Sequence, residues 1–474
     1  MSVISTQTLK KLREIPVGHL PRTLTQDSAG NIWVTNQDDA TLSIINGTTF
    51  EIMNTMHLPY ASRPFGICAD AKGTTVLVTL EATGTIIKIN SHSQEIEDSL
   101  KTFPKPRGIA ISGDGNAFFL SRFLSPRDHG ELGRFQLNPL KQIKPISLVY
   151  DETVDSKSNG HGVPNSLSFV CISPDGQNLW VPFIKDNVKR GLYVNPSLPA
   201  PDFESTVRTG VAQIDITSDS EVISKRVDLD NRSFASAVAF SSKGEHAFVA
   251  TETSNEIAIY NSLEMERISA LEPQNREQER GPNVLAVLSN DSVLFIHYFL
   301  SREIGVYDIS QVGGSNLLTQ LALIPTVKQE ILPPEVLRGK QIFYNAADPR
   351  MATDKYISCA ACHFEGGSDG RIWDFTHKGE GLRRTPSLVG KTGVGNGPLH
   401  WSGNFDEVQD FEHDIRGFFG GKGFIDSSLF FSGTHNEALG DPKVGLSQSL
   451  DDLTAYIKSL NQPHLSPFRN TDGT

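Results

Sequence analysis

Residues 63–90 read RPFGICADAKGTTVLVTLEATGTIIKIN, a proline followed by three short apolar runs that two polar turns separate. Val, Ile and Thr dominate the runs, and Asp, Lys and Gly occupy the first turn. Short runs rich in β-branched residues, bounded by turn residues, predict antiparallel strands that pair with their neighbours in the sequence. We therefore expect residues 63–90 to form most of one small antiparallel sheet.

The same pattern occurs six times before residue 300. The units begin at Pro21, Arg63, Pro106, Pro164, Ser236 and Pro282. Their alignment places mostly small residues at one equivalent position, namely Thr25, Cys68, Ala110, Cys171, Ala239 and Val287, which are 42 to 68 residues apart. Units of about 40–45 residues with four strands are typical of β-propeller blades. We predict an all-β propeller of six to seven four-stranded blades over residues 1–325, with this position on the innermost strands.

These units resemble the YVTN-type β-propeller repeats that occur in many exported bacterial proteins. The third strands, expected at residues 42–46, 86–90 and 257–261, carry the likeness, which covers about residues 1–325. The resemblance implies a fold and says little about function, because propellers host many unrelated activities.

The start of the chain looks like the third and fourth strands of a blade whose first two strands are absent. Strands near residues 313–330 would complete the ring in one interpretation. In the other, the sequence begins downstream of an export signal. Its first residues lack the basic start, apolar core and small-residue cleavage site of a signal peptide, and the sequence leaves both interpretations open.

Charge and cysteine content exclude several classes of protein. The chain has 43 Lys and Arg against 55 Asp and Glu, a net charge of −12, and no basic cluster, which argues against nucleic-acid binding. No apolar run approaches the roughly 18 residues of a transmembrane segment. Of the four cysteines, Cys68 and Cys171 are expected to be buried free thiols two blades apart.

The texture changes after residue 326. Helices are expected at residues 333–344 and 450–460, and between them lies Cys359-Ala-Ala-Cys362-His363. Cys-x-x-Cys-His attaches c-type haem: the two thiols form thioethers with the porphyrin, and the histidine ligates the iron. A redox-active pair would need a thioredoxin-like βαβ context, and a zinc site would need further cysteines. We predict that residues 326–474 form a mainly α c-type cytochrome domain with one covalent haem.

Residues 381–390 (GLRRTPSLVG) and 397–404 (GPLHWSGN) complete a second resemblance. Over about residues 333–460 the chain is similar to the C-terminal domain of bacterial di-haem cytochrome c peroxidases and the MauG group. It departs from that family in having a single Cys-x-x-Cys-His, so a relay between two haems cannot operate within this chain. It also has no methionine after Met351, so the usual distal methionine is absent.

The second axial ligand of the iron therefore stays open at this point. His413, in the expected helix near where the family carries its distal residue, and His400, just after the Thr-Pro-Ser-Leu segment, are the main candidates. His377 and His435 are weaker ones, and an open or water-bound iron is the other possibility. Arg383 and Arg384 are expected to pair with haem propionates, because guanidinium groups suit carboxylates. The acidic, Gly-rich loop 365–371 is a weak candidate for calcium.

Three functions are compatible with these features. The first is an exported mono-haem cytochrome that transfers electrons or serves as an oxidoreductase subunit, with a redox partner protein or a small-molecule substrate. The second is a mono-haem peroxidase-like enzyme with an open iron face and an acid–base group such as His400, Glu407 or Glu412. The third is a propeller binding module with a structural or sensory haem. Since haem is normally attached to this motif outside the bacterial cytoplasm, we expect a periplasmic or otherwise exported protein, and this favours a start that lacks its export signal.

Overall fold

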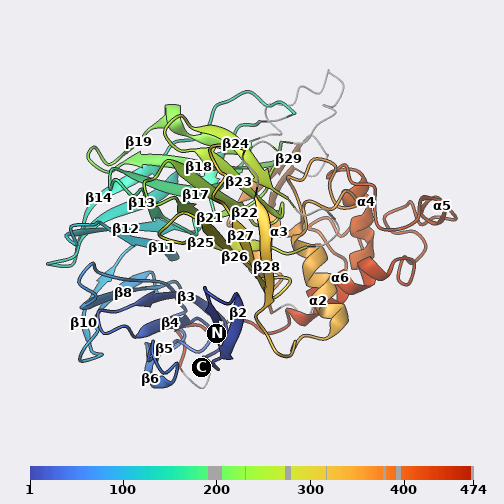
Figure 1. The fold of residues 1–474 in the computed structure, drawn as a ribbon. Coiled ribbons are helices and arrows are strands. Elements are labelled where there is room, and N and C mark those ends of the chain that lie inside the picture. The colour runs from blue at the N-terminus through green and yellow to red at the C-terminus, as the bar shows by residue number, and fades with distance from the viewer. Residues whose placement is uncertain are drawn as a thin grey trace.

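The computed structural model describes residues 1–157, 159–189, 205–229, 231–272, 279–315, 318–376, 381–390 and 397–470. Six antiparallel sheets follow one another along the first two thirds of the chain, as a six-bladed β-propeller. First strands of neighbouring sheets, such as β3 and β7 or β7 and β11, contact each other, so they are the innermost strands. Figure 1 shows the C-terminal part of the chain lying on one side of this propeller.

The blades are simple meanders except for the fourth, which carries two extra short strands. The first blade consists of β3 (Pro21–Gln26), β4 (Ile32–Asn36), β5 (Thr41–Ile45) and β6 (Ile52–His57), and the second of β7 (Pro64–Ala69), β8 (Thr75–Leu80), β9 (Thr85–Asn90) and β10 (Ile96–Lys101). The third consists of β11 (Pro106–Ile111), β12 (Ala117–Arg122), β13 (Gly130–Gln136) and β14 (Lys141–Leu148), and the fourth of β15 (Val163–Asn165), β16 (Cys171–Ile172), β17 (Asn178–Asp186), β18 (Val207–Asp215), β19 (Ser220–Glu221) and β20 (Val227–Leu229). The fifth consists of β21 (Ala235–Phe240), β22 (His246–Thr251), β23 (Glu256–Asn261) and β24 (Glu266–Leu271), and the sixth of β25 (Pro282–Val287), β26 (Val293–Tyr298), β27 (Glu303–Asp308) and β28 (Thr319–Pro325).

The repeat alignment is right for five blades and one residue out in the sixth. Ala239 pairs with Phe248 across β21 and β22, and the matching pair in the last blade is Ala286 with Phe295. Ala286, not Val287, is therefore the residue equivalent to Ala239. In five blades an Asp or Ser side chain accepts hydrogen bonds from the turn that follows this position, whereas the sixth blade has Leu288 there, so its turn carries no such marker.

The N-terminal segment forms a hairpin of its own, β1 (Ser2–Ser5) with β2 (Lys10–Glu14), as the sequence predicts for two outer strands. It lies between the last blade and the first. The Ser2 hydroxyl and the Lys11 ammonium donate to the carbonyl of Thr326, just after β28. On the other side, Val3 of the hairpin packs in a cluster with Val34 and other apolar residues of the first blade. The hairpin joins neither sheet, and whether a further segment precedes it stays a prediction.

The C-terminal part contains fewer helices than a mainly α domain requires. Among the described residues of this part, only α2 (Pro334–Tyr344) and α6 (Gln448–Ser459) exceed two turns, and both match predicted helices. The remaining elements are short: α3 (Cys359–Cys362), η2 (Phe364–Gly366), β29 (Ile372–Phe375), β30 (Gly381–Arg384), η5 (Val408–Phe411), α4 (Glu412–Arg416) and α5 (Ser427–Phe430). Ten glycines with positive φ interrupt the described residues between 366 and 445. Since helical residues have negative φ, these positions end helices before they lengthen.

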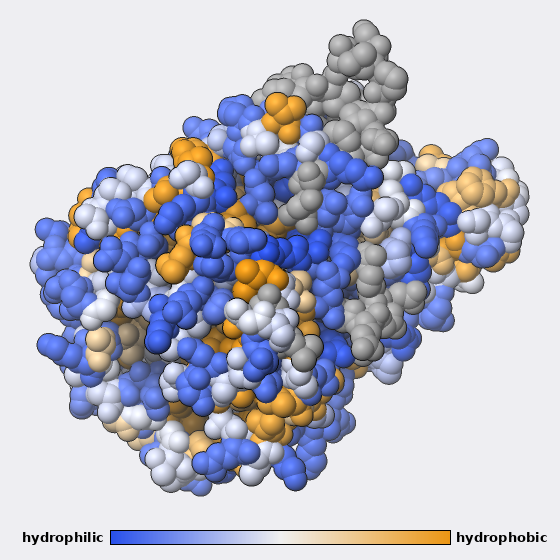
Figure 2. Space-filling view, turned by 45° about the horizontal axis from the view of Figure 1, so that its top comes forward, coloured by the Kyte–Doolittle hydropathy of each residue, from blue (hydrophilic) through white to orange (hydrophobic). Residues whose placement is uncertain are grey.

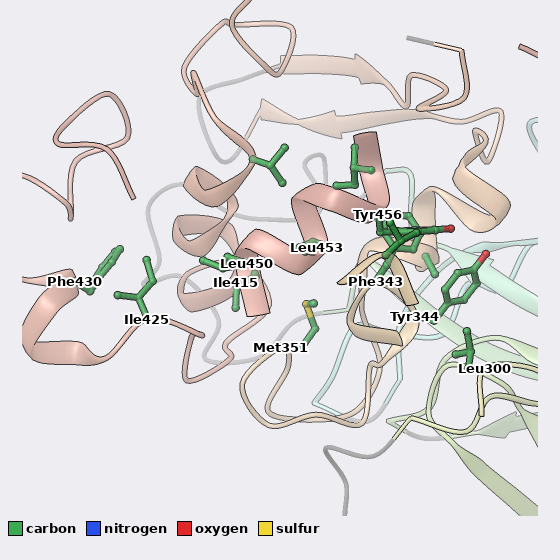
Figure 3. Packing of buried hydrophobic residues seen from close by; sticks show 14 residues of the cluster. Leu300, Phe343, Tyr344, Met351, Ile415, Ile425, Phe430, Leu450, Leu453 and Tyr456 are labelled. Atoms are coloured by element: carbon green, nitrogen blue, oxygen red, sulfur yellow. The ribbon is translucent and has the colours of Figure 1, made fainter. Parts of the chain in front are cut away.

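Helices α2 and α6 pack face to face and form the core of this part. Phe343 of α2 packs against Tyr456 of α6, with ring centroids 5.1 Å apart, and Leu453 belongs to the same apolar cluster (Figure 3). The helices approach so closely that a Cβ on Gly339 would lie 1.8 Å from the carbonyl oxygen of Asp452. This core holds the short α3 helix against the propeller.

The visible surface is mainly hydrophilic. Figure 2 shows apolar side chains scattered singly or in small groups over one face. Among the residues that the structure describes, no helix is both long enough and apolar enough to cross a membrane.

Candidate functional site

The Cys-x-x-Cys-His motif forms α3 and the residue that ends it, on the side of the C-terminal part that faces the propeller. Cys359 and Cys362 are free thiols with part of their surface accessible. Desolvation by the surrounding protein raises the pKa of Cys359 to about 12 and that of Cys362 well above its ordinary value. Redox-active cysteines have a lowered thiol pKa, so this environment opposes that use.

His363 is held as a neutral imidazole. Desolvation lowers its pKa to about 4; the carbonyl groups of Gly367 and Pro386 oppose this effect, and His400 adds to it. The Nδ1 atom lies 3.3 Å from the carbonyl oxygen of Gly367. Because a carbonyl only accepts, Nδ1 carries the proton and Nε2 keeps a lone pair. This is the state in which histidine binds a metal.

The two main candidates for a second ligand, His400 and His413, make different contacts. His400 is close enough to His363 to affect its pKa, and its Nε2 lies 3.6 Å from Asp414, which in turn acts on the pKa of Cys359. The Nδ1 atom of His400 lies 3.0 Å from the side-chain oxygen of Asn404. Both histidines thus direct Nδ1 at an oxygen atom.

The His413 ring instead packs against Phe405 and Phe430, with centroids 6.1 and 5.2 Å apart. Its Nε2 is buried and has no hydrogen-bond partner. Desolvation and the nearby Lys443 ammonium lower its pKa. The described ring contacts of this side chain are thus with Phe430 of α5 and with Phe405, which also packs against the His400 ring at 4.4 Å.

The other predicted ligands and the two arginines are dispersed. His377 lies outside the described residues, and His435 is half-buried with Nδ1 2.9 Å from the carbonyl of Ser432. Arg383 and Arg384 are neighbours on β30, and the Trp401 indole donates to the Arg384 carbonyl at 2.6 Å. Trp401 follows His400, so β30 lies close to one of the two ligand candidates. Pairing of the arginines with propionates stays a prediction.

The loop proposed for calcium uses its carboxylates in other ways. Asp369 accepts hydrogen bonds from Trp373 Nε1 at 2.9 Å and Thr385 Oγ1 at 3.0 Å. Glu365 is paired with two arginines of the propeller. Within the described ranges, no group of three or more His, Cys, Asp or Glu side chains is arranged to hold a metal ion. The two carboxylates are thus committed to protein donors.

The pairing of Glu365 joins the motif to the propeller. One oxygen of Glu365 lies 2.7 Å from Arg22 of β3, and the other lies 2.7 Å from Arg107 of β11. Arg107 also contacts Glu81, at 3.1 Å, in the loop after β8. The two guanidinium groups lower the pKa of Glu365 to about 2, despite the desolvation that opposes them. Three blades therefore contribute to one buried ionic cluster beneath the motif.

Aromatic stacking accompanies this ionic cluster. The Phe364 ring stacks on Phe234, which precedes β21, with centroids 3.7 Å apart and planes at 10°. Phe364 also meets Tyr344 of α2 edge-on, and the Tyr344 hydroxyl accepts from the backbone N–H of Glu365 at 3.2 Å. The Arg107 guanidinium lies 3.5 Å from the ring of Phe123. Residues 364–365 are thus fixed from the propeller side and from α2.

Comparison with known proteins identifies the fold alone. No protein-family model matches the sequence, and no curated protein matches it. Hydrazine synthase of Kuenenia stuttgartiensis aligns with a TM-score of 0.51 and 16% identity, over 66% of this chain and 90% of that one. Virginiamycin B lyase of Staphylococcus aureus aligns with a TM-score of 0.44 and 15% identity, over 65% and 85% of the two chains. The first of these likenesses supports the propeller fold, and neither carries a function to this chain.

Sequence reasoning named the cysteines and histidines and placed Glu365 in a calcium loop, but it did not predict Arg22 and Arg107 as the partners of Glu365. A faint signal exists, because two units open with the same Pro-Arg pair, at Pro21 and Pro106. An arginine at the start of an innermost strand would be buried near the propeller axis, where it needs an anionic partner. The sequence gives no indication that this partner directly follows His363 and Phe364.

Proposed function

We propose that this chain is an exported c-type cytochrome that carries one haem on Cys359, Cys362 and His363 and passes single electrons. The observation that carries the proposal is the arrangement of the motif itself: His363 directs Nδ1 at the Gly367 carbonyl, 3.3 Å away, directly after the free thiols of Cys359 and Cys362. A haem bound there would supply one-electron exchange at its iron. The protein would hold it through two thioethers and through imidazoles that Gly367 and Asn404 orient.

The residues present suit such a group. A neutral His363 with a free lone pair on Nε2 can bind iron without first losing a proton, and burial keeps it neutral at physiological pH. His400 offers a second imidazole with its Nδ1 likewise committed. We propose that His400 would supply the second imidazole in preference to His413, whose ring lies between Phe405 and Phe430. Two imidazoles favour ferric iron more than a histidine–methionine pair does, which lowers the reduction potential.

The contacts of the acidic residues favour electron transfer over peroxidase chemistry. Glu412 is fully buried and accepts from Arg416 at 2.7 Å and from the backbone N–H groups of Phe424 and Ile425. Glu407 accepts from the backbone of Lys443. Carboxylates held in this way are poorly placed to shuttle protons to a peroxide. The propeller, whose face toward the C-terminal part is occupied by Phe364 and Glu365, serves in this proposal as the support of the haem loop.

The optical spectrum of the haem-loaded protein tests the proposal. We expect low-spin ferric iron that does not respond to peroxide or cyanide. His400→Ala should convert it to a high-spin form, while the matched variant His413→Ala should leave it low-spin. A high-spin, peroxide-reactive parent protein would support the peroxidase-like alternative and overturn electron transfer. If His413→Ala converts the iron to the high-spin form and His400→Ala does not, the assignment of His400 is overturned.

A further inference from the structure

We propose that Arg22 and Arg107 are positioning residues: they clamp Glu365 and thereby seat the haem loop over the propeller axis and set the charge beside the iron. This inference rests on the proposed function for its haem-dependent part. Its other part concerns the polypeptide alone, so the two can fail independently.

The first step is geometric. Partners of residues 364–365 come from blades on different sides of the ring: Arg22 and Arg107 from the first and third, and Phe234 from the start of the fifth. Contacts from such separate blades converge only near the axis. Phe364 and Glu365, the two residues that directly follow His363, therefore lie at the centre of the propeller face.

The second step concerns burial and charge. Arg107 and Glu81 are 3% and 5% exposed, and Glu365 is 22% exposed. Among the described residues of the propeller, Glu81 is the carboxylate that pairs with Arg107, and none lies within salt-bridge distance of Arg22, whose carboxylate partner is Glu365. The Arg22 Nε atom instead donates to the neutral amide of Gln37 at 2.6 Å. Leaving a largely buried cation without an anionic partner costs free energy. The propeller therefore presents a cationic site that the carboxylate of Glu365 neutralises.

The third step concerns the backbone. Glu365 has a φ of 56°, a left-handed conformation that non-glycine residues adopt only when their surroundings impose it. Its side chain reaches both arginines from this conformation, two residues after the iron ligand. The position of His363 is thereby coupled to the propeller through a short, fixed segment.

The fourth step gives the clamp an electrostatic consequence. Ferric haem carries one more positive charge than ferrous haem, so a nearby carboxylate stabilises the ferric state and a nearby guanidinium opposes it. Loss of Glu365 and loss of an arginine should therefore move the potential in opposite directions. A purely structural loosening of the loop would move it in one direction for all variants.

The first arm of the test uses the full chain without haem. Glu365→Gln, Arg22→Gln and Arg107→Gln are compared with Glu97→Gln, which removes an exposed ion pair with Lys88. Limited proteolysis between the propeller and α2, at residues 326–333, reports loss of the contact between residues 364–365 and the propeller. We expect cleavage about tenfold faster or more in the clamp variants, the ratio that 1.4 kcal/mol of lost docking gives, and no change for Glu97→Gln. Cleavage at the parent rate in Glu365→Gln would overturn the clamp.

The second arm uses the haem-loaded proteins and measures the reduction potential. Glu365→Gln should raise it, whereas Arg22→Gln and Arg107→Gln should lower it, with Glu97→Gln unchanged. Because Arg107 is the more buried arginine, Arg107→Gln is the variant more prone to misfold; in that case Arg22→Gln alone provides the comparison of reduction potentials. Shifts of the same sign, or none, would overturn the electrostatic role of the clamp. If no haem attaches to the parent chain, the proposed function fails, and the first arm still decides the clamp.

Discussion

At the scale of single residues, two carboxylic acids near the axis occupy opposite environments. Glu365 is held as an anion between Arg22 and Arg107, which lower its pKa to about 2. Glu252, in the loop after β22, is buried, and burial together with the negative charge of Glu365 raises its pKa to about 8. The folded protein therefore keeps Glu252 protonated at neutral pH. Two glutamates of one face are thus in different charge states.

The state of Glu252 makes stability depend on pH. Its pKa is 4.5 in the ordinary state and about 8 when folded, so the folded chain binds the extra proton between these values. The contribution of Glu252 to the free energy of unfolding is fully present below pH 4.5 and is lost as the pH rises toward 8. Glu252→Gln, which is neutral throughout, should match the parent at pH 4.5 and exceed its free energy of unfolding by roughly 4 kcal/mol at pH 8.

Urea unfolding of the parent and of Glu252→Gln between pH 4.5 and 8 measures this difference. The exposed Glu95→Gln serves as the control and should show no pH-dependent difference. If the Glu252→Gln and parent curves stay parallel over this range, Glu252 is ionised in the folded protein.

At the scale of elements, the turns explain both the success and the error of the repeat alignment. Asp70 Oδ1 accepts from the backbone N–H groups of Thr74 and Thr75, and Ser241 Oγ accepts from that of His246. Asp and Ser at this position are visible in the sequence and define where the second strand begins. Leu288 cannot make these bonds, so the sixth blade was aligned one residue late.

Helix prediction succeeded where apolar periodicity is regular and failed where glycines follow one another. The α6 helix has Leu450, Leu453 and Ile457 on its buried face, a spacing that the sequence displays. Between α3 and α6 the chain is shaped by positive-φ glycines and by polar contacts. Such contacts join residues far apart in the sequence, so periodicity does not reveal them.

The crossing of α2 and α6 makes a prediction at this scale. Gly339→Ala places a methyl group against the backbone of Asp452, where it has no room. We expect a loss of about 1–3 kcal/mol in the free energy of unfolding, the usual cost of overpacking a tight contact. Gly113→Ala is the control, because a Cβ there meets no atom within 4 Å. An unchanged urea midpoint for Gly339→Ala would show that the helices can separate at little cost.

At the scale of the whole molecule, the sequence identifies two parts and does not reveal how they meet. The six blades follow from local repeats, and the haem motif follows from the spacing of three residues. The Arg107–Glu365 pair, by contrast, links positions 258 residues apart. Nothing in the local pattern of either segment specifies that contact. The fold of the propeller was thus predictable, the haem site stays a prediction, and the contact between residues 364–365 and the propeller required the structure.

The central claim is that Cys359 and Cys362 hold a haem covalently. The most direct measurement is the mass of the intact chain after expression with export and with the haem-attachment machinery. We predict a mass increase of one haem per chain that persists under denaturing conditions and is abolished in the Cys359→Ala, Cys362→Ala double variant. A chain that leaves that machinery folded but without added mass would contradict the account.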